Sequence, residues 1–418
     1  MESPHAAHQR AIYLSGFAGA RPQVPTDAKL LEQKAQQAMS PEAFAYIAGG
    51  AGLEETVSAN RYAFQRRRIV PRMLRDVSRR DTSVELFGTH LPAPLLLSPV
   101  GVLELVHPQA DVAVGRAAAQ LGVPYIFSNQ ASKPMETVAA AMGHQPRWFQ
   151  LYWSKSNALV ASFAERAEAC GCSAIVVTLD TTLLGWRTRD LDLGYLPFLE
   201  GKGIAQYTSD PVFQKLMDEP LPPSPRKVNA HTLRGLVSMV RAYPGAGFVR
   251  KLLSGRPVKA VQQFVNLYSN PALSWDDLKF LRNHTRLPIL LKGILHPDDA
   301  RLARDHGING LIVSNHGGRQ VDGAISTLDA LPAIVEATGN QMPVLLDGGI
   351  RCGADMFKAL ALGATAVCIG RPYAYGLAIG GQPGVEDVLR HFMADFELTM
   401  ALAGCRSVAE IREAGVRE

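Results

Sequence analysis

The stretch Gly310-Leu311-Ile312-Val313-Ser314-Asn315-His316-Gly317-Gly318-Arg319-Gln320 decides the fold of this chain. Its first four residues form a short apolar run that predicts a buried β-strand, and polar groups follow where that strand ends. His316 offers a proton acceptor and Arg319 a fixed cation, while Gly317 and Gly318 let the backbone turn sharply and a ligand approach. Taken alone, the stretch fits a core histidine beside a solvated arginine as well as it fits a site where a base and a cation bind a small hydroxy acid. The rest of the chain must therefore decide between the two.

The pattern of an apolar run followed by a helix-like stretch recurs along the chain. Strands that alternate with helices favour a parallel sheet, and eight such strands favour a closed (β/α)8 TIM barrel. A doubly wound open sheet is the alternative, but it does not require eight units. The predicted strands are Leu95-Leu97, Tyr125-Phe127, Arg147-Gln150, Ala174-Leu179, Ile289-Leu291, Leu311-Val313, Val344-Leu346 and Ala366-Ile369. The predicted helices include Ala110-Leu121, Asn157-Ala169, Pro297-His306, Asp329-Thr338 and Ala354-Leu362.

Each predicted strand ends in residues suited to binding or catalysis. In a barrel the carboxyl ends of all strands meet around one mouth, so these residues are expected to form a single site. They are Ser98 to Gly101, Ser128 to Gln130, Gln150 to Tyr152, Thr178 to Asp180, Lys292 with Gly293, Ser314 to Arg319, Asp347 to Gly349, and Gly370 with Arg371.

Two regions lie outside the barrel repeat. Residues 1–90 are expected to form a helical N-terminal extension that packs on the barrel of residues 91–418, with a helix at Pro41-Ala48 that stops at glycines. Residues 191–274 form a long insertion after the fourth strand, expected to act as a lid or a subunit contact. The Pro-rich piece Pro220 to Pro225 within it is expected to be irregular.

The composition is that of a globular protein. Of the 418 residues 47% are hydrophobic and 19% are charged. No stretch approaches the roughly 20 apolar residues that a membrane-spanning helix needs. The N-terminus lacks the features of a signal peptide, and the five cysteines show no zinc-type pairing. A cytoplasmic location and no metal site are therefore expected.

Positive charge is concentrated in the insertion. The net charge is +5, yet the segment between Glu219 and Asp276 carries eight cations and no acidic residue. Its stretches His231-Arg241 and Phe248-Leu253 mix cations with apolar residues, so contact with a membrane is one interpretation. We favour a lid or subunit contact whose charge attracts an anionic substrate. Nucleic-acid binding is not expected, because aromatic residues are few and no known motif frames the cations.

An anion cradle and a buried cation are predicted at the mouth. Asp347-Gly348-Gly349-Ile350-Arg351 and Gly370-Arg371-Pro372 follow successive strands, where barrels often bind phosphate through glycine backbone amides. Lys292 ends an apolar strand, so its ammonium group needs an anion. A cofactor that gains negative charge on reduction, such as a flavin, would suit it. An ion pair with a carboxylate of a neighbouring strand is the alternative.

At these residues the chain resembles the family of FMN-dependent α-hydroxy acid oxidases and dehydrogenases, over roughly residues 28 to 411. The most specific motifs are Ser314 to Gln320, Asp347 to Arg351 and Lys358 to Ala364. Within that family the chain is most similar to the lactate 2-monooxygenases. That similarity is carried by Ser98 to Val102, Gly185 to Leu191 and Thr208 to Lys215.

The resemblance implies FMN across the barrel mouth and a 2-hydroxy acid beside it. FMN would be bound by Pro99, Val100, Gly101, Ser128, Gln150, Thr178, Lys292, Ser314, Asp347, Gly348, Gly349, Arg351, Gly370 and Arg371. The substrate would be held by Tyr46, Gln130, Tyr152, Arg187, His316 and Arg319, with both arginines on its carboxylate. The catalytic residues would be His316 as the base, Asp180, Tyr152 and Arg319. Asp180 would fix the tautomer of His316, although capping of the following segment is the ordinary alternative for an aspartate after a strand.

Two positions bear on specificity. Gly101 stands where oxidases of the family usually carry alanine and lactate monooxygenases carry glycine, so it leaves room beside the flavin. Gln130 stands where most members place an apolar or aromatic residue over the substrate side chain. An amide at that place indicates a substrate that forms a hydrogen bond there, rather than plain lactate.

The expected reaction is oxidation of a small, lactate-like (S)-2-hydroxy acid to the 2-keto acid, with oxygen as the electron acceptor. A monooxygenase-like version would retain the keto acid and decarboxylate it, giving acetate, carbon dioxide and water from lactate. The alternatives are a membrane-associated dehydrogenase that passes electrons to quinone and a non-redox barrel that binds a phosphorylated ligand. A homo-oligomer, either a tetramer or an octamer, is expected.

Overall fold

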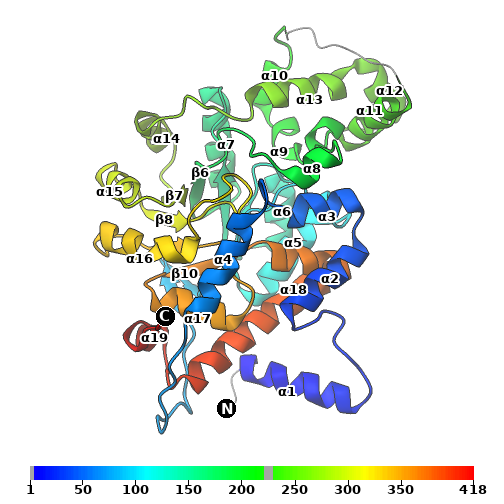
Figure 1. The fold of residues 1–418 in the computed structure, drawn as a ribbon. Helices are drawn as coiled ribbons and strands as arrows, with labels where there is room; N and C mark the ends of the chain where they lie inside the picture. The colour runs from blue at the N-terminus through cyan, green and yellow to red at the C-terminus, as the bar shows by residue number, and fades with distance from the viewer. Residues whose placement is uncertain (1–3, 221–228) are drawn as a thin grey trace.

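A computed structural model describes residues 4–220 and 229–418, and parallel strands close into a barrel at its centre (Figure 1). Around the barrel the strands follow the order β10-β3-β4-β5-β6-β7-β8-β9. This confirms the predicted (β/α)8 TIM barrel. The strands are β3 (Leu95–Leu97), β4 (Tyr125–Phe127), β5 (Arg147–Leu151), β6 (Ile175–Thr178), β7 (Ile289–Ile294), β8 (Gly310–Val313), β9 (Val344–Leu346) and β10 (Ala366–Ile369).

Strand β7 is longer than predicted, and the difference matters for the site. It continues through Lys292, which pairs with Thr178 of β6, to Ile294. The register with β8 shifts between Lys292 and Ile294. Gly293 between them has φ 110°, and a Cβ there would lie 3.0 Å from Cβ of Asp180. Only glycine accommodates this backbone so close to the end of β6.

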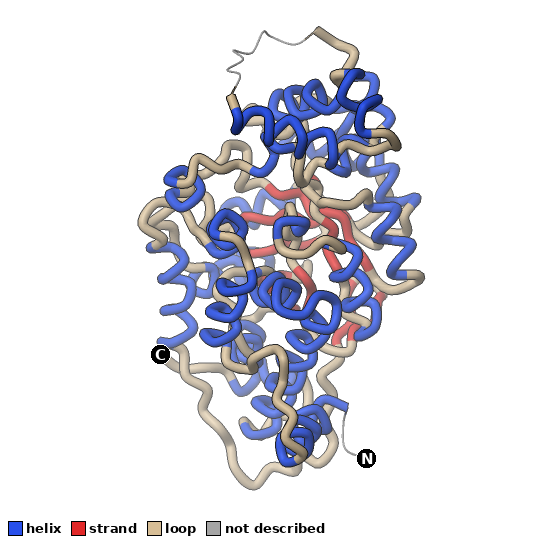
Figure 2. The backbone as a smooth tube through the Cα atoms, turned by 90° about the vertical axis from the view of Figure 1, so that its right-hand side faces the viewer, coloured by secondary structure: helices blue, strands red, loops and turns tan. Residues whose placement is uncertain are grey.

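Every barrel strand is followed by a helix on the outside of the sheet, and Figure 2 shows the strands enclosed by helices. These helices are α5 (Ala110–Leu121), α6 (Met135–Met142), α7 (Asn157–Ala169), α14 (Leu278–His284), α15 (Pro297–Asp305), α16 (Thr327–Thr338), α17 (Gly353–Ala361) and α18 (Arg371–Leu402). The 3-10 helix η1 (Leu103–Leu105) precedes α5, and α19 (Val408–Ala414) follows α18. The helices predicted from the sequence agree with these bounds to within two residues.

The core has two layers because side chains alternate along each strand. One layer is the outer shell between the strands and the helices. The other fills the barrel, and every strand contributes to it: Leu96, Ile126, Trp148, Val176, Leu290, Ile312, Leu345 and Cys368. The barrel is thus filled with side chains, and a ligand can bind only at one of its ends.

A short antiparallel hairpin closes one end of the barrel. It consists of β1 (Val84–Leu86) and β2 (Thr89–Leu91), which the expected helical extension did not include. Leu86 and Leu91 join the inner core, and the ring of Phe87 lies 5.7 Å from that of Trp148. The opposite end, where the strands have their carboxyl termini, is left for binding.

Up to Arg66 the N-terminal extension is largely helical, whereas residues 67–83 form no helix. It contains α1 (Pro4–Phe17), α2 (Ala28–Ala38), α3 (Pro41–Ala48) and α4 (Glu55–Arg66). Ser40 caps α3, with its hydroxyl accepting a hydrogen bond from the amide of Ala43, and Pro41 occupies the first helical turn. Helix α3 is mostly buried and ends at the carboxyl edge of the barrel, so it brings Tyr46 to the mouth.

The insertion between β6 and β7 is also largely helical. It contains α8 (Thr188–Asp192), η2 (Pro197–Glu200), α9 (Ala205–Thr208), α10 (Pro211–Leu216), α11 (Ala230–Ala242), α12 (Phe248–Ser254), α13 (Arg256–Leu267) and η3 (Trp275–Asp277). Figures 1 and 2 both show α11, α12 and α13 at the top of the molecule. Residues 221–225 of the predicted irregular piece, together with Arg226 and Lys227, lie outside the described residues.

Two structural features bear on the predictions about membranes and cysteines. Among residues 4–220 and 229–418, no helix is sufficiently long and apolar to pass through a bilayer. All five cysteines are free thiols, namely Cys170, Cys172, Cys352, Cys368 and Cys405.

Candidate active site

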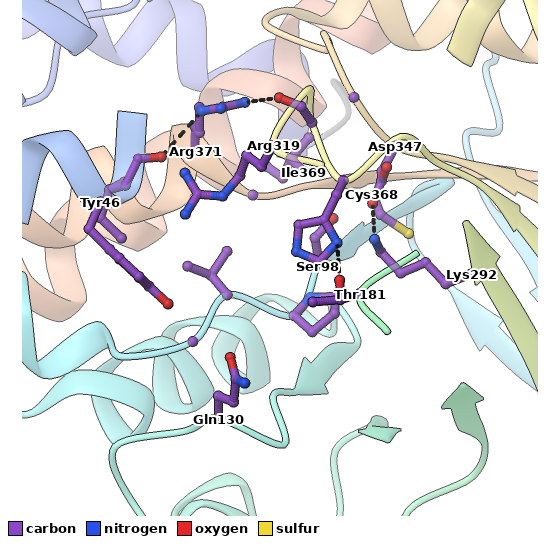
Figure 3. Close-up of a pocket in the computed structure, with 18 of the residues that line it drawn as sticks. Tyr46, Ser98, Gln130, Thr181, Lys292, Arg319, Asp347, Cys368, Ile369 and Arg371 are labelled. Carbon is purple, nitrogen blue, oxygen red and sulfur yellow. Dashed lines mark hydrogen bonds and ion pairs between the residues drawn. The ribbon is translucent and has the colours of Figure 1, made fainter. Parts of the chain in front are cut away.

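A cavity opens at the carboxyl ends of the barrel strands, and the predicted site residues gather around it (Figure 3). Sixteen of them line it directly: Tyr46, Pro99, Val100, Gly101, Gln130, Tyr152, Arg187, Lys292, His316, Arg319, Asp347, Gly348, Gly349, Arg351, Gly370 and Arg371. Asp180, Ser128, Gln150, Thr178 and Ser314 stand behind this wall, in or just after the strands. The strand ends therefore converge on one mouth, as the barrel geometry requires.

His316 is oriented by a carboxylate. Its Nδ1 lies 2.7 Å from Oδ1 of Asp180, the residue that follows the end of β6 by two positions. The hydroxyl of Thr181 donates to the same oxygen at 2.9 Å and lies 3.2 Å from Nδ1. An ionised carboxylate can only accept hydrogen bonds, so Nδ1 carries a proton and Nε2 is left as the basic nitrogen.

The backbone of His316 is also constrained. Its φ is 58°, an unusual value for a residue other than glycine, and its amide donates to Oγ of Ser314 at 3.1 Å. Gly317 and Gly318 continue the left-handed turn, with φ of 63° and 78°. The turn directs the imidazole into the cavity, and side chains on either glycine would collide with Arg371 or Val57.

Burial sets the charges of this pair. Burial lowers the pKa of His316 below its ordinary value of 6.5, although Asp180 opposes the change, so the imidazole is neutral near pH 7. For Asp180 burial alone would raise the pKa, but the charges of His316 and Lys292 and two hydrogen bonds bring it down to about 2. The pair therefore consists of a neutral base and an ionised carboxylate.

Arginine side chains crowd the opposite part of the cavity. Arg187 is buried, and its guanidinium reaches the carbonyl of Arg319 at 3.3 Å and Oε1 of Gln320 at 3.2 Å. Arg319 donates to the carbonyl of Gly49 at 2.7 Å and stacks over Tyr46, 5.2 Å from the ring centre. Burial, reinforced by the charges of Arg187 and Arg371, lowers the pKa of Arg319 to about 9. This cluster would be stabilised by an anion in the cavity.

Arg371 connects the extension to the barrel. Its guanidinium donates to the carbonyls of Ile47 at 3.2 Å, Gly317 at 2.8 Å and Gly49 at 2.9 Å. Figure 3 shows Arg371 beside Arg319, facing the helix that carries Tyr46. Arg371 thus holds the end of α3 and the loop after β8 in place, in addition to lining the cavity.

Lys292 forms the ion pair that the sequence left as an alternative. Its ammonium lies 3.2 Å from Oδ2 of Asp347 and 2.9 Å from Oγ of Ser314. Burial alone would lower the pKa of Lys292, but the carboxylates of Asp347 and Asp180 outweigh it and raise the pKa. Asp347 therefore holds a cation at the cavity wall, and its other oxygen has no partner among the described residues.

Two tyrosines complete the polar wall. Tyr46 comes from α3 of the extension and Tyr152 from the residue after β5, and both are buried. Burial raises the pKa of Tyr46, and it raises the pKa of Tyr152 to about 12. Both phenols therefore keep their protons at neutral pH and can donate hydrogen bonds.

Buried polar atoms near the strand ends lack partners within the described protein. Oγ of Ser98, Nε2 of Gln150 and Oγ1 of Thr178 have none, although Oε1 of Gln150 accepts from the amide of Asn129 at 3.1 Å. An unpaired buried polar group costs about 1–3 kcal/mol. These atoms are therefore placed to bind a polar ligand at the barrel mouth.

The last two strands provide an anion-binding corner. Gly348 and Gly349 have φ of 91° and 82°, and Cβ atoms there would meet Thr327 and the backbone of Asn60 at 3.1 and 2.8 Å. Burial, reinforced by Arg371, lowers the pKa of Arg351 to about 10. A phosphate group would relieve this uncompensated charge.

The sequence did not identify several residues of the cavity wall. Ile47, Thr181, Leu184, Phe198 and Tyr268 also line it. Phe198 and Tyr268 belong to the insertion, and no local motif marks either of them. The position of Thr181 directly after Asp180 was the one signal available.

Comparison with known proteins adds four findings. A family model described as FMN-dependent dehydrogenase matches residues 35–418. The chain is 43% identical to an FMN-dependent alpha-hydroxy acid dehydrogenase of Penicillium citrinum, over 97% of this chain and 94% of the relative. It is also 43% identical to an L-lactate oxidase of Lysinibacillus sphaericus, over 91% of this chain and 90% of that protein. A crystal structure of mandelate oxidase superposes with a TM-score of 0.76 at 35% identity, covering 94% of this chain and 99% of the other.

Proposed function

Because the chain belongs to the FMN-dependent dehydrogenase family and is an FMN-dependent α-hydroxy acid oxidoreductase, we propose that it oxidises a small (S)-2-hydroxy acid to the 2-keto acid with oxygen as the acceptor. The observation that carries this proposal is the carboxylate-oriented imidazole of His316 in one cavity with Arg187 and Arg319. A 2-hydroxy acid needs a base for its proton and a cation for its carboxylate, and this cavity offers both.

The residues of the mouth fit FMN. The unpaired Gln150 Nε2 and Thr178 Oγ1 would bond the polar edge of the ring, beside Ser128 and Ser314, and the backbone of Pro99 to Gly101 would face it. Lys292 would supply positive charge near the ring. Gly348, Gly349, Arg351, Gly370 and Arg371 would hold the phosphate. Bound FMN supplies the acceptor for the two electrons that leave the substrate.

Substrate binding is assigned to the cations and phenols of the wall. Arg187 and Arg319 would grip the carboxylate, which would also relieve their mutual repulsion. Tyr46 and Tyr152, both protonated, would donate hydrogen bonds to substrate oxygens. This arrangement would hold the α-carbon within reach of Nε2 of His316.

His316 is the proposed base. Nε2 would accept one proton from the substrate, and the resulting imidazolium would be stabilised by Asp180, whose carboxylate already receives Nδ1–H. That proton comes either from the hydroxyl group or from the α-carbon. Comparing the effects of solvent deuterium and α-deuterium on the rate of flavin reduction distinguishes the two routes.

The fate of the keto acid is the finer part of the proposal. Gly101 lies against Gln130 in the cavity wall, and a Cβ on Gly101 would come within 3.1 Å of Gln130, so an alanine would fit there only if Gln130 shifted. The glycine that lactate 2-monooxygenases also carry at this position supports retention of the keto acid and its oxidative decarboxylation. Release of the keto acid and peroxide would instead mark an ordinary oxidase.

A membrane-associated dehydrogenase is the second candidate, and the insertion favours it. Helix α12 exposes Phe248, Val249, Leu252 and Leu253, and residues 229–275 carry six cations and no acidic residue. Such a surface would suit an anionic bilayer, where quinone would be the acceptor. Sedimentation with anionic vesicles at low and high salt tests this candidate. The FMN dependence of the family argues against the non-redox barrel considered from the sequence.

The decisive experiment is anaerobic mixing of the yellow holoenzyme with a panel of 2-hydroxy acids. Bleaching of the flavin absorbance by at least one (S)-enantiomer is expected, and no bleaching by any member would contradict the proposal. Oxygen uptake and peroxide release, measured on the same samples, then separate an oxidase from a monooxygenase. A bleached enzyme that reoxidises slowly in air but rapidly with a quinone would favour the membrane candidate. Cytoplasmic location and assembly into a tetramer or octamer stay predictions.

A further inference from the structure

Part of the cavity wall is polar but uncharged, and the insertion helps to build it. Gln130 follows β4 and Tyr268 follows α13, and both line the cavity that contains His316 and the arginines. In the reaction proposed above, neither residue accepts the substrate proton or binds the substrate carboxylate. Their chemistry therefore bears on another part of the substrate.

The side-chain amide of Gln130 faces the cavity and has no hydrogen-bond partner among the described residues. The residue is 7% exposed, and its backbone is fully paired: its amide donates to Oγ of Ser128 at 3.1 Å and its carbonyl accepts from Val102 at 2.9 Å. Its side-chain oxygen and nitrogen form no hydrogen bond within residues 4–220 and 229–418. Figure 3 shows this side chain reaching from the cavity wall toward its centre. A bound substrate that covers this amide without pairing with it would leave it unsatisfied, which is costly.

The backbone carbonyl and the Cβ of Gln130 are held in place by two close neighbours. A Cβ on Gly101 would lie 3.1 Å from Cβ of Gln130, and a Cβ on Gly203 would lie 3.1 Å from its carbonyl oxygen. Gln130 is thus packed between two glycine backbones. The same hypothetical Cβ on Gly203 would also lie 3.2 Å from the ring of Phe198, so Gln130 and Phe198 are neighbours in the wall.

Tyr268 is held near the same part of the wall by aromatic packing. Its ring stacks on Phe264 at 5.1 Å, and Phe264 in turn lies 5.2 Å from Phe198. The preceding carbonyl, that of Leu267, accepts hydrogen bonds from the hydroxyl of Ser154 at 2.9 Å and the amide of Lys155 at 3.1 Å. Tyr268 is therefore fixed to the loop after β5, and its phenol forms no hydrogen bond to any described residue.

We infer that Gln130 and Tyr268 form a specificity subsite for a substrate whose side chain ends in a neutral hydrogen-bonding group, such as a hydroxyl, a phenol or an amide. An apolar substrate side chain would cover the amide of Gln130 and leave it unpaired, and a second carboxylate would find no cation from these two residues. This inference rests on the proposed function, because it assumes that the carboxylate and α-carbon are held by Arg187, Arg319 and His316.

The test compares matched substrates on the holoenzyme. One pair is 2,4-dihydroxybutanoate with 2-hydroxypentanoate, which replaces the terminal hydroxyl with methyl, and the other is 4-hydroxymandelate with 4-methylmandelate. We expect kcat/KM for anaerobic flavin reduction to favour the hydroxylated member of at least one pair by roughly tenfold, the value of about one buried hydrogen bond. Malate, with its second carboxylate, is expected to be a poorer substrate than 2,4-dihydroxybutanoate.

Two variants assign the preference to these side chains. In Gln130→Leu the ratio of kcat/KM between the two members of the preferred pair should fall toward one. In Tyr268→Phe, which keeps the stacked ring, the same ratio should fall by several-fold. Each ratio is measured within one protein preparation, so a general loss of activity does not affect it. Equal rates within both pairs for the unmodified protein, a malate rate above the others, or ratios unchanged in both variants would overturn the inference. Failure of every 2-hydroxy acid to bleach the flavin would instead contradict the proposed function.

Discussion

The imidazole of His316 and the carboxylate of Asp180 meet at 2.7 Å, although 136 positions of the chain separate them. One residue follows β8 and the other follows β6, and both strands pair in parallel with β7, so the sheet brings the two side chains together. Oδ1 of Asp180 also accepts from Thr181, while its Oδ2 is buried without a partner in the described residues. The pair is thus arranged to keep one imidazole nitrogen free for a proton.

Replacing His316 by Gln should remove the base and leave the cofactor site intact. We expect the rate of flavin reduction by substrate to fall at least about 1,000-fold, in the upper part of the range for general-base catalysis. Stopped-flow absorbance measures this rate. His90→Gln is the matched control, because His90 lies exposed on β2 at the far end of the barrel. Near-normal reduction by a yellow His316→Gln protein would refute the assignment.

Asp180→Asn should be nearly as harmful while it preserves the shape of the side chain. An amide can donate to Nδ1, which would move the imidazole proton to Nε2 and block proton acceptance there. A loss of at least about 100-fold in flavin reduction is expected. Thr181→Val provides a comparison, since it removes one hydrogen bond to Asp180 and leaves the charge, and a loss of only a few-fold is expected. Equal effects in the two variants would show that the charge of Asp180 is unimportant.

The pH dependence of kcat/KM should follow the protonation of His316. Burial lowers the pKa of His316 below 6.5, and the proposed mechanism requires the neutral form. Activity should therefore rise with pH through an apparent pKa below 6.5 and then stay level to pH 8. In Asp180→Asn this acidic limb should move to lower pH, because the carboxylate that raises the pKa is gone. A limb at or above pH 7 would disagree with a neutral, buried base.

The lowered pKa of His316 also predicts that the folded protein becomes less stable in acid. The folded pKa is lower than the unfolded one, so the unfolded chain binds more protons as the pH falls below 6.5. This contribution to the free energy of unfolding is complete above pH 6.5 and decreases until the pH reaches the folded pKa. Urea denaturation at pH 7 and pH 5 should show a smaller difference for His316→Gln than for the unmodified protein.

Gly101→Ala should change the partition of products. The added methyl group would lie 3.1 Å from Cβ and from the carbonyl oxygen of Gln130, so a shift of a few tenths of an ångström is required. The cavity wall would then change shape beside the proposed FMN site, and we expect more peroxide per oxygen consumed. Peroxide release and carbon dioxide formation, measured together, report the partition. An unchanged ratio would show that this glycine does not control it.

The barrel could be predicted because its signals are local. Each strand is a short apolar run that ends in polar residues, and their bounds agree closely with the structure, apart from the extension of β7 through Lys292. The hairpin of β1 and β2 was missed because its strands, Val84–Leu86 and Thr89–Leu91, are interrupted by polar residues and are not apolar runs. Its turn at Phe87 and Gly88, with φ of 49° and 71°, lacks the usual asparagine-glycine signal.

Only some residues of the site could be placed from the sequence. Residues in strand-end motifs were placed correctly at the mouth, since parallel strands present their carboxyl ends together. The partner of Lys292 stayed open, because the sequence does not show whether Asp347 faces the cavity or its neighbour. Tyr268 could not be found at all, since its place depends on how α13 packs against the loop after β5.

The carbonyl of Gly49 receives hydrogen bonds from Arg319 and Arg371, which lie 270 and 322 residues further along the chain. During synthesis the extension leaves the ribosome long before these guanidinium groups exist. These two hydrogen bonds at the end of α3 can therefore form only after the last barrel strand has been made, so the mouth is finished only when nearly the whole polypeptide has emerged. Maturation into a ligand-ready enzyme is for this reason a late event, and a nascent chain arrested before β10 would have an open, incomplete rim.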